Sequence, residues 1–142
     1  MPTTLNEQYA WAAGFLDGEG CFGLHKAHKG CHPSTKGVMV SAAQLRKSPL
    51  DRLSSLFGGN VNPMNRQGEF YAWQWNRYGH QARFLLESIL PYLVLKQDEA
   101  QDLIDYLDTG AWQGKPVPQQ VIDERYAIIA NHEYHRKAEV NR

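Results

Sequence analysis

The chain has 142 residues, enough for one two-layer core and too few for two ordinary domains. Its hydrophobic (42%) and charged (21%) fractions are typical of a globular protein, and no apolar run is long enough to cross a bilayer. The polar N-terminus lacks the basic and apolar segments of a secretory signal. We therefore expect one soluble, intracellular domain over 1–142, without a membrane partner and with no disulfide implied by its two cysteines.

Charge is distributed unevenly along the chain. The formal net charge is zero, but the segment from Cys21 to Arg83 contains nine basic and two acidic residues, a net charge of +7. The remainder carries −7, including a run of acidic residues at Asp98, Glu99, Asp102, Asp105 and Asp108. If the two segments occupy different faces, one of them is basic enough to bind nucleic acid. The alternative is a solvated acidic helix with scattered basic loops.

The first predicted element is a helix. Thr4 and Glu7 have the spacing of a capping box, and apolar residues follow at helical spacing until the pattern stops near Gly18. Alternating patterns then predict two strands, at 21–26 and 38–45. The segment between them is rich in Gly, Pro, Ser and Thr, which predicts a loop with basic and imidazole groups at its tip.

A second helix and a second hairpin follow. Ser48-Pro49 predicts a helix start and Gly58-Gly59 its end, and strands at 61–66 and 69–77 flank Gln67-Gly68. In the last strand Tyr71, Trp73 and Trp75 alternate with smaller and polar residues, so we expect this aromatic face in the core. Helical patterns continue from Gly79, with breaks at Pro91 and 109–118 and a last helix at about 119–135.

This order predicts an α+β domain in which helices cover one face of a four-stranded antiparallel sheet, in the order αββαββα. The other face is expected to be exposed and polar. Alternation assigns to it His25, Ser41, Asn62, Arg66, Gln74 and Asn76. Amide and basic groups on a sheet have the geometry that reads base edges in the DNA major groove. A solvated face without a ligand is the alternative.

Residues 12–20, AAGFLDGEG, resemble the signature of the LAGLIDADG homing endonucleases, with Ala12 for the usual leucine and Glu19 for aspartate. Gln44, the Phe57-Gly58-Gly59 turn and the segment PYLVLK at 91–96 also resemble that family's pattern, in the same order, so the resemblance covers nearly the whole chain. It implies a saddle-shaped sheet and cleavage of double-stranded DNA across the minor groove. Because only one motif is present, it further implies a homodimer and a pseudo-palindromic target.

The resemblance also implies the chemistry of the site. Glu19 is expected to be catalytic and, with the Gly18 carbonyl, to bind Mg²⁺ or Mn²⁺, because hard cations prefer such oxygen ligands. Ca²⁺ is expected to be a non-cleaving substitute. Gln44 and Lys96 match the family's active-site polar and basic positions, where they would organise water and offset charge developing on the phosphate.

The same helix is expected to form the dimer interface. Ala10, Ala13 and Gly14 are small residues at i, i+3 and i+4, a spacing that allows a second helix to approach closely. Asp17 resembles the family's structural carboxylate, and we assign it to this interface and not to the metal.

Further DNA contacts are expected from the first hairpin tip and from basic residues near the sheet: His28, Lys29, Arg46, Lys47 and Arg77. The resulting hypothesis is an intron- or intein-encoded, site-specific DNA endonuclease without a small-molecule substrate, located in the cytoplasm or nucleoid of a prokaryote or phage host, or in an organelle.

Two other functions are compatible with the sequence. The first is a maturase, or another non-cleaving nucleic-acid-binding protein, on the same scaffold. The second is a small structural metal module, built on residues whose spacing fits no standard zinc finger: Cys21, His25, His28, Cys31 and His32.

Overall fold

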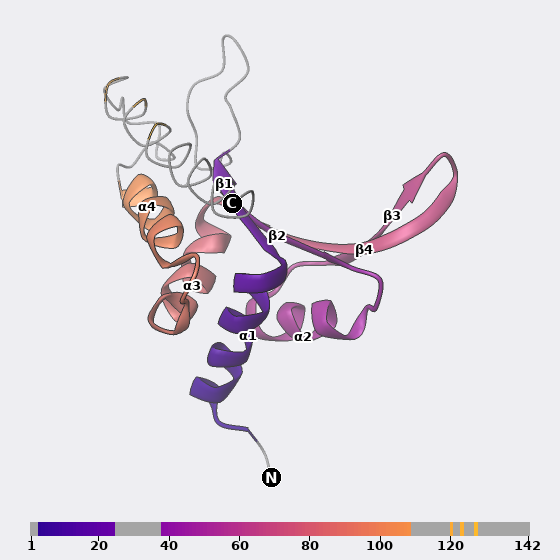
Figure 1. Ribbon diagram of the computed structural model, residues 1–142, viewed down its shortest axis with the longest axis horizontal. Helices are drawn as coiled ribbons and strands as arrows, with labels where there is room; N and C mark the ends of the chain where they lie inside the picture. Colours follow the sequence, from indigo (N-terminus) through magenta and orange to yellow (C-terminus); the bar gives the residue numbers. More distant parts are fainter. Residues whose placement is uncertain (1–2, 25–37, 109–119, 121–122, 124–126, 128–142) are drawn as a thin grey trace, which may run out of the picture.

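The computed structural model describes residues 3–24 and 38–108, together with positions 120, 123 and 127. Its elements, in chain order, are α1 (Leu5–Glu19), β1 (Gly20–Leu24), β2 (Val38–Gln44), α2 (Ser48–Phe57), β3 (Val61–Arg66), β4 (Glu69–Tyr78), α3 (Gly79–Ile89), the 3₁₀ turn η2 (Leu90–Tyr92) and α4 (Gln97–Asp108) (Figure 1). The αββαββα order is thus confirmed. The expected loop at 27–37 and the last helix at 119–135 lie almost wholly outside the described residues. No described helix has the length and apolar character needed to span a membrane.

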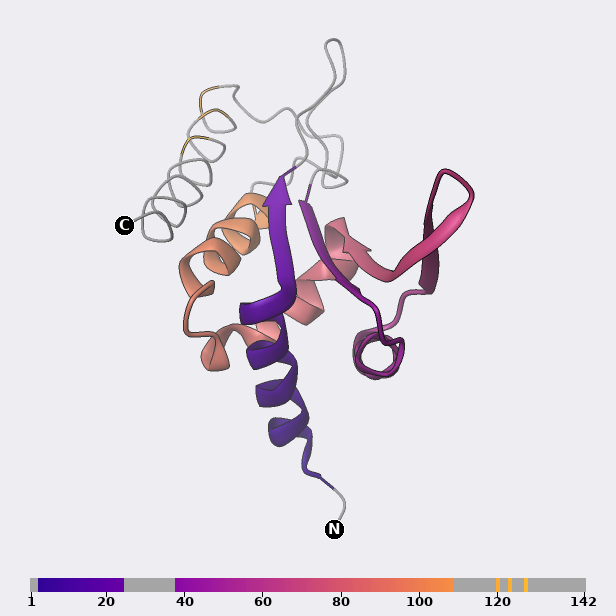
Figure 2. The ribbon, with the colours of Figure 1, turned by 45° about the vertical axis from the view of Figure 1, so that its right-hand side comes forward.

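The four strands form one antiparallel sheet in the order β1-β2-β4-β3. The central strands are therefore β2 and β4, with β1 and β3 at the edges. The pairs Gly20–Ala42, Ala42–Trp75 and Val61–Trp75 fix the register across all four strands. Figures 1 and 2 show that the β3–β4 hairpin curves away from the helices, so the sheet is longer than the layer that covers it.

One face of the sheet, here called the helix face, carries the core. Phe22, Ala42 and Trp75 lie on it and are each at most 3% exposed. They belong to one cluster with buried residues of the four helices, including Leu16 and Leu86. Burying side chains of this size stabilises the fold by about 1.5–3 kcal/mol each. The first helix begins as expected, because the Thr4 hydroxyl accepts the backbone N–H of Glu7 at 3.2 Å.

The Gly58-Gly59 turn joins α2 to β3 and packs against β4. Both glycines have positive φ, +79° and +92°. The indole N–H of Trp75 donates to the carbonyl of Gly58 at 2.8 Å, and a Cβ on Gly59 would lie 2.9 Å from the Arg77 Cδ. Because the chain passes so close to β4, glycine is required at this position.

The β3–β4 hairpin departs from the expected burial. Its turn residues Gln67 and Gly68 both have positive φ, as in a type I′ turn. Trp75 is fully buried and Trp73 packs against the core, but Tyr71 is 41% exposed. The expectation that all three aromatic residues are core is therefore wrong for Tyr71, because this part of the hairpin extends past the helices (Figure 1).

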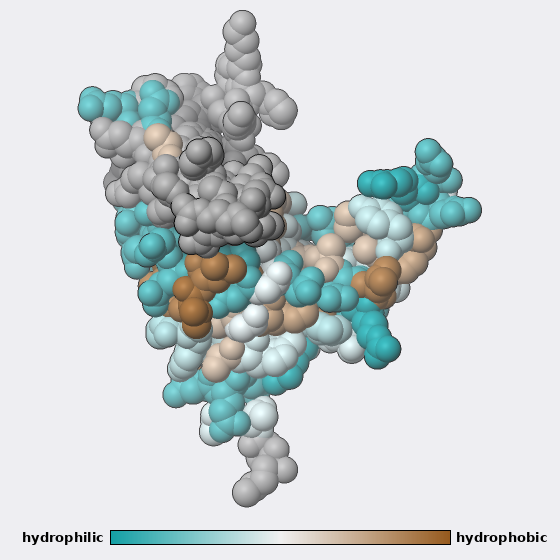
Figure 3. Space-filling model, in the orientation of Figure 1, coloured by the Kyte–Doolittle hydropathy of each residue, from teal (hydrophilic) through white to brown (hydrophobic). Residues whose placement is uncertain are grey.

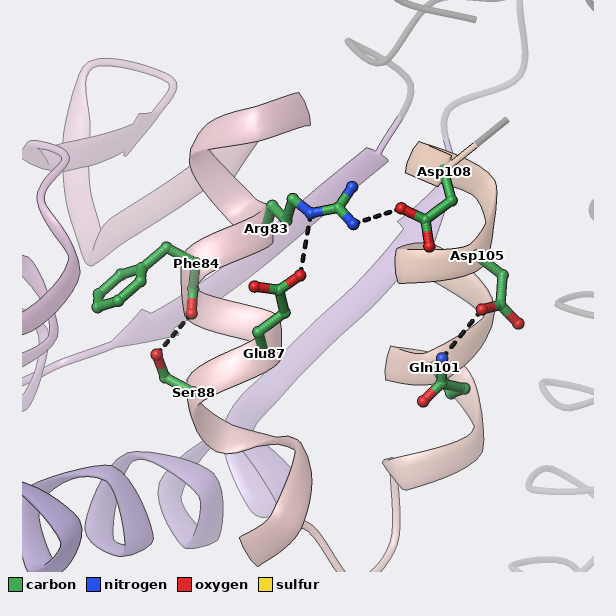
Figure 4. A network of polar contacts seen from close by, with 7 residues as sticks. All are labelled: Arg83, Phe84, Glu87, Ser88, Gln101, Asp105 and Asp108. Carbon is green, nitrogen blue, oxygen red and sulfur yellow. Dashed lines mark hydrogen bonds and ion pairs between the residues drawn. The ribbon is translucent and has the colours of Figure 1, made fainter. Parts of the chain in front are cut away.

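Arg83 connects α3 to the acidic helix α4, as Figure 4 shows. Its Nε donates to Glu87 at 2.9 Å, and its guanidinium also donates to Asp108. The hydrogen bond that Arg83 donates to Asp108, together with the charges of both carboxylates and the bond to Glu87, raises the pKa of Arg83, although burial opposes the shift. Such exposed ion pairs contribute at most about 1 kcal/mol each. Part of the acidic run is thus neutralised within the helical layer.

Candidate functional site

Glu19 is the last residue of α1, and its side chain is exposed. The helix ends there because Gly20 adopts an extended conformation and starts β1, while its backbone N–H still bonds to the carbonyl of Leu16. The chain therefore passes from helix to strand without a loop. This places the carboxylate at a fixed point where α1 meets the sheet edge.

Glycine at position 20 is a steric requirement of this junction. A Cβ there would lie 2.6 Å from the Leu16 carbonyl oxygen, a backbone atom that moves only with the helix. We expect Gly20→Ala to lower the free energy of unfolding by about 2 kcal/mol, as overpacking does, and to displace Glu19. Gly23→Ala is the matched control, because a Cβ on Gly23 meets no atom within 4 Å. Denaturant titration of both variants measures the difference, and equal stability would show that the junction is not tight.

Asp17 anchors a distant segment of its own chain to the end of α1. Its carboxylate accepts the backbone N–H groups of Val94, Leu95 and Lys96 at 2.7, 3.1 and 2.9 Å. The sequence assigns Asp17 to the dimer interface, but in the structure its carboxylate bonds within the chain. Sequence spacing does not indicate this contact, because the partners are 77–79 positions apart.

Lys96 is brought beside the same helix end and is only 4% exposed. Its ammonium donates to the carbonyl of Asp17, two residues before Glu19. A cation at this point is favourable because the C-terminus of a helix carries partial negative charge. A hydrogen bond within the chain therefore fixes Lys96, and its positive charge lies at the end of the helix that carries Glu19.

Gln44 ends β2, where it pairs with Trp73, and it is half-buried. Its Oε1 accepts the backbone N–H of Leu45 at 3.1 Å. Ala42, two residues earlier, pairs with Gly20, the residue that follows Glu19. The structure thus brings Lys96 to the C-terminal end of α1 and places Gln44 two residues along β2 from the partner of Gly20.

A metal site within a single chain is incomplete. Among the described residues, no group of three or more His, Cys, Asp or Glu side chains lies close enough to hold a metal ion. The Glu19 carboxylate and the Gly18 carbonyl are hard oxygen donors that suit Mg²⁺, but this cation takes about six ligands. These donors fit the ion only if further oxygens come from outside the chain. Of the residues proposed for a zinc module, Cys21 is exposed with a free thiol, and the other four lie outside the described residues.

The exposed side of α1 differs from the expected stripe in one residue. Ala10 and Gly14 are exposed, but Ala13 is fully buried in the core. Ala13 is therefore unable to contact a partner, because it faces inward at i+3 while Gly14 faces outward. Gly18 is also exposed, so the small-residue stripe is Ala10, Gly14 and Gly18, spaced by four residues.

The sheet face opposite the helix face is here called the open face. It is defined by the strand pairing, with allowance for the unpaired Tyr71 of β4, and its described residues are Cys21, Gly23, Met39, Ser41, Ala43, Asn62, Met64, Arg66, Glu69, Tyr71, Ala72, Gln74, Asn76 and Tyr78. Asn62, Gln74 and Asn76 lie on it as expected. Ser41 also lies there but is only 9% exposed.

Of the two arginines of the hairpin expected to contact DNA, one lies on the open face. Arg77 pairs with Val40 on the helix face and lies against Gly58 and Gly59. Arg66 follows Asn62 and Met64 in the alternation along β3, as expected, and stacks over Tyr71, 5.3 Å from the ring centre. The register shift leaves Tyr71 of β4 unpaired, so Tyr71 lies beside Met64 on the open face while Phe70 packs against Trp73 on the helix face.

The other expected DNA contacts are at the margin of the sheet. Lys47 lies over the Trp73 ring at 5.2 Å and 3.7 Å from Asp51, while Arg46 is exposed. His25, His28 and Lys29 lie outside the described residues. On the described part of the open face the charged residues are Arg66 and Glu69, which pair with each other, so these strands do not form the basic face expected from the charge distribution.

No protein-family model matches the sequence, and no curated protein matches it. Solved structures match by fold. The homing endonuclease I-CvuI, in complex with the I-CreI target, has a TM-score of 0.71 and 20% identity over 92% of this chain and 82% of its own. The archaeal intron-encoded homing endonuclease I-Vdi141I, complexed with DNA, has a TM-score of 0.67 and 13% identity over 92% and 85%.

The meganuclease I-SmaMI, bound to uncleavable DNA, has a TM-score of 0.63 and 16% identity over 85% of this chain but 42% of its own. The chain thus has the fold of the LAGLIDADG homing endonucleases. It is similar to about half of the larger I-SmaMI chain.

Proposed function

We propose that the chain is one subunit of a homodimeric, metal-dependent endonuclease that cuts both strands of a pseudo-palindromic DNA site across the minor groove. The observation that carries the proposal is the exposed Glu19 carboxylate at the end of α1, the helix end at which Lys96 donates to the Asp17 carbonyl. It is supported by the fold shared with homing endonucleases that bind DNA.

The surface around α1 supports pairing with a second copy. The stripe of Ala10, Gly14 and Gly18 leaves room for close helix packing. The backbone N–H groups of Val94 and Leu95 donate to Asp17 at the end of this helix. Their aliphatic side chains are 89% and 57% exposed. Figure 3 shows apolar surface gathered over α3 and its connection to α4, beside α1. Exposed apolar groups next to a small-residue stripe are typical of an interface between subunits.

Pairing of two α1 helices would complete the site. Two Glu19 carboxylates and two Gly18 carbonyls would then lie together, as Mg²⁺ or Mn²⁺ requires. When bound, a divalent cation supplies polarisation of the scissile phosphate and a more acidic water. Gln44 orients water through its carboxamide, and Lys96 adds positive charge behind the carboxylates to offset charge on the phosphate.

Gly14→Leu is expected to abolish the dimer. A Cβ on Gly14 meets no atom of its own chain within 4 Å, so the monomer accepts the side chain. A facing α1 at close distance does not, and we expect the dimer to weaken at least a hundredfold. Gln81→Leu, which adds the same side chain at an exposed position of α3, is the control. Sedimentation of both variants measures the change, and a Gly14→Leu dimer of unchanged affinity would place the interface elsewhere.

The function itself is tested with a randomised duplex library. Purified protein is incubated with the library in Mg²⁺, in Mn²⁺ and in Ca²⁺, and cut ends and retained duplexes are sequenced separately. We expect double-strand breaks at sites with two related half-sites in Mg²⁺ or Mn²⁺, and retention without cutting in Ca²⁺. Retention without cutting in all three cations would favour the non-cleaving nucleic-acid-binding function.

A further inference from the structure

Helix α1 separates two surfaces of the chain. Gly14 lies on its exposed side, and Trp11 and Asp17 lie about 60° to either side of Gly14, because an α-helix turns by about 100° per residue. Trp11 contacts Arg52 of α2, whereas Asp17 binds the segment that leads into α4. Figure 1 shows α2 on one side of α1 and the α3–α4 connection on the other. We call these surfaces the α2 flank and the α4 flank.

The α2 flank presents a fixed positive charge. Arg52 is exposed, and its Cζ lies 4.1 Å from the centre of the Trp11 ring, which itself stacks on Phe15 at 5.5 Å. The neighbouring Asp51 pairs with Lys47, and Arg52 makes no ion pair with another described residue. The ring contact therefore restricts the guanidinium but leaves its charge uncompensated.

The α4 flank presents aliphatic groups and a negative charge. Val94 and Leu95 are exposed, and Asp98 follows them in the first turn of α4. Asp98 is exposed and makes no ion pair with another described residue. Lys96 does not offset it at the surface, because it is only 4% exposed. The two flanks of α1 thus carry opposite charges.

The symmetry of the proposed dimer determines which flanks meet. Both Glu19 carboxylates lie together only if the two α1 helices run in the same direction, with a two-fold axis between and along them. Rotation by half a turn about such an axis brings the α4 flank of each chain opposite the α2 flank of its partner. If like flanks met, Asp98 would face Asp98 and Arg52 would face Arg52, which is unfavourable.

We propose, on the basis of the proposed homodimer, that the two flanks recognise each other between subunits, with Asp98 of each chain paired with Arg52 of the partner subunit. Val94 and Leu95 pack beside this ion pair and are covered by the partner. Because Lys96 follows them directly, the partner also holds in place the segment that brings Lys96 to the end of α1. Part of the uneven charge of the sequence thereby serves recognition between two copies of the chain.

Charge reversal tests the pairing without DNA. Asp98→Lys and Arg52→Glu should each weaken the dimer by about tenfold or more, because two symmetric attractions become repulsions. The double variant restores opposite charges at both contacts, so its dimer affinity should return to within about threefold of the parent. Sedimentation of the full chain over a range of concentrations at low salt measures all four affinities.

Glu69→Lys is the matched control, because it makes the same change of charge at an exposed position of the β3–β4 hairpin, away from α1 (Figure 1). It should leave the dimer affinity unchanged. Single variants that dimerise like the parent, or a double variant as weak as the single ones, would overturn the proposed pairing and leave the proposed function intact. A parent chain that stays monomeric at every concentration would overturn both.

Discussion

Glu19→Gln is expected to reduce DNA cleavage by about a thousandfold or more, which corresponds to about 4 kcal/mol of transition-state stabilisation. Glutamine keeps the size of the side chain but lacks the negative charge that a divalent cation needs from its ligand. Because Glu19 is exposed and makes no hydrogen bond or ion pair with another described residue, stability should be unchanged. In the proposed dimer both copies carry the substitution, so both carboxylates would be lost.

A measurement of DNA binding shows whether Glu19→Gln removes only a metal ligand or disrupts the whole DNA-binding site. DNA affinity in Ca²⁺ should stay within about threefold of the parent, because phosphate and base contacts lie on other residues. Glu7→Gln is the matched control, because Glu7 is an exposed carboxylate at the opposite end of the same helix. Cleavage and binding are measured on one selected site. A Glu19→Gln enzyme that cuts at the parental rate would remove this carboxylate from the mechanism.

Asp17→Ala is expected to destabilise the protein by about 3 kcal/mol and to impair cleavage. The carboxylate accepts three backbone N–H groups, and hydrogen bonds to charged groups contribute a net of about 1.5–3 kcal/mol each, less where they are exposed, as those of Val94 and Leu95 are. Asp17→Asn keeps one acceptor oxygen, so it should lose less. Hydrogen exchange should accelerate at the amides of Val94, Leu95 and Lys96, where the bonds are broken.

Glu87→Ala is the control for this prediction. It also removes a carboxylate, but one whose ion pair with Arg83 is exposed, so the free energy of unfolding should fall by at most about 1 kcal/mol. Chemical denaturation measures the stability of both variants at equal protein concentration, because a dimer's stability depends on concentration. Unchanged exchange at residues 94–96 in Asp17→Ala would show that the anchor is not present in solution.

Much of the fold follows from local patterns. The strands are predicted because alternation has a period of two, and the Gln67-Gly68 turn and the Gly58-Gly59 turn mark where the chain reverses. The same period correctly assigns Gln74 and Asn76 to the open face. The end of α1 is also predicted, because the capping box and the glycines flank a single helical pattern.

The remainder depends on contacts that a local pattern does not contain. A bulge in β4 leaves Tyr71 unpaired and turns it toward Met64, so it is exposed and not part of the core. Ala13 and Gly14 are both small residues, and only the packing of α1 decides which of them is buried. The hydrogen bond from Lys96 to the Asp17 carbonyl joins segments that are far apart in sequence. The family resemblance therefore predicted a role for Lys96 in the site but did not indicate that it contacts Asp17.

The Asp17 anchor also determines the stage of synthesis at which the end of α1 becomes fixed. The helix bearing Glu19 leaves the ribosome early, but the amides that fix its end belong to residues 94–96. Contacts between such distant segments form late, because the intervening loop must first be closed. A nascent or truncated chain that stops before Lys96 has the acidic residue but not the braced helix end. The proposed cleavage of DNA would therefore require synthesis at least as far as Lys96.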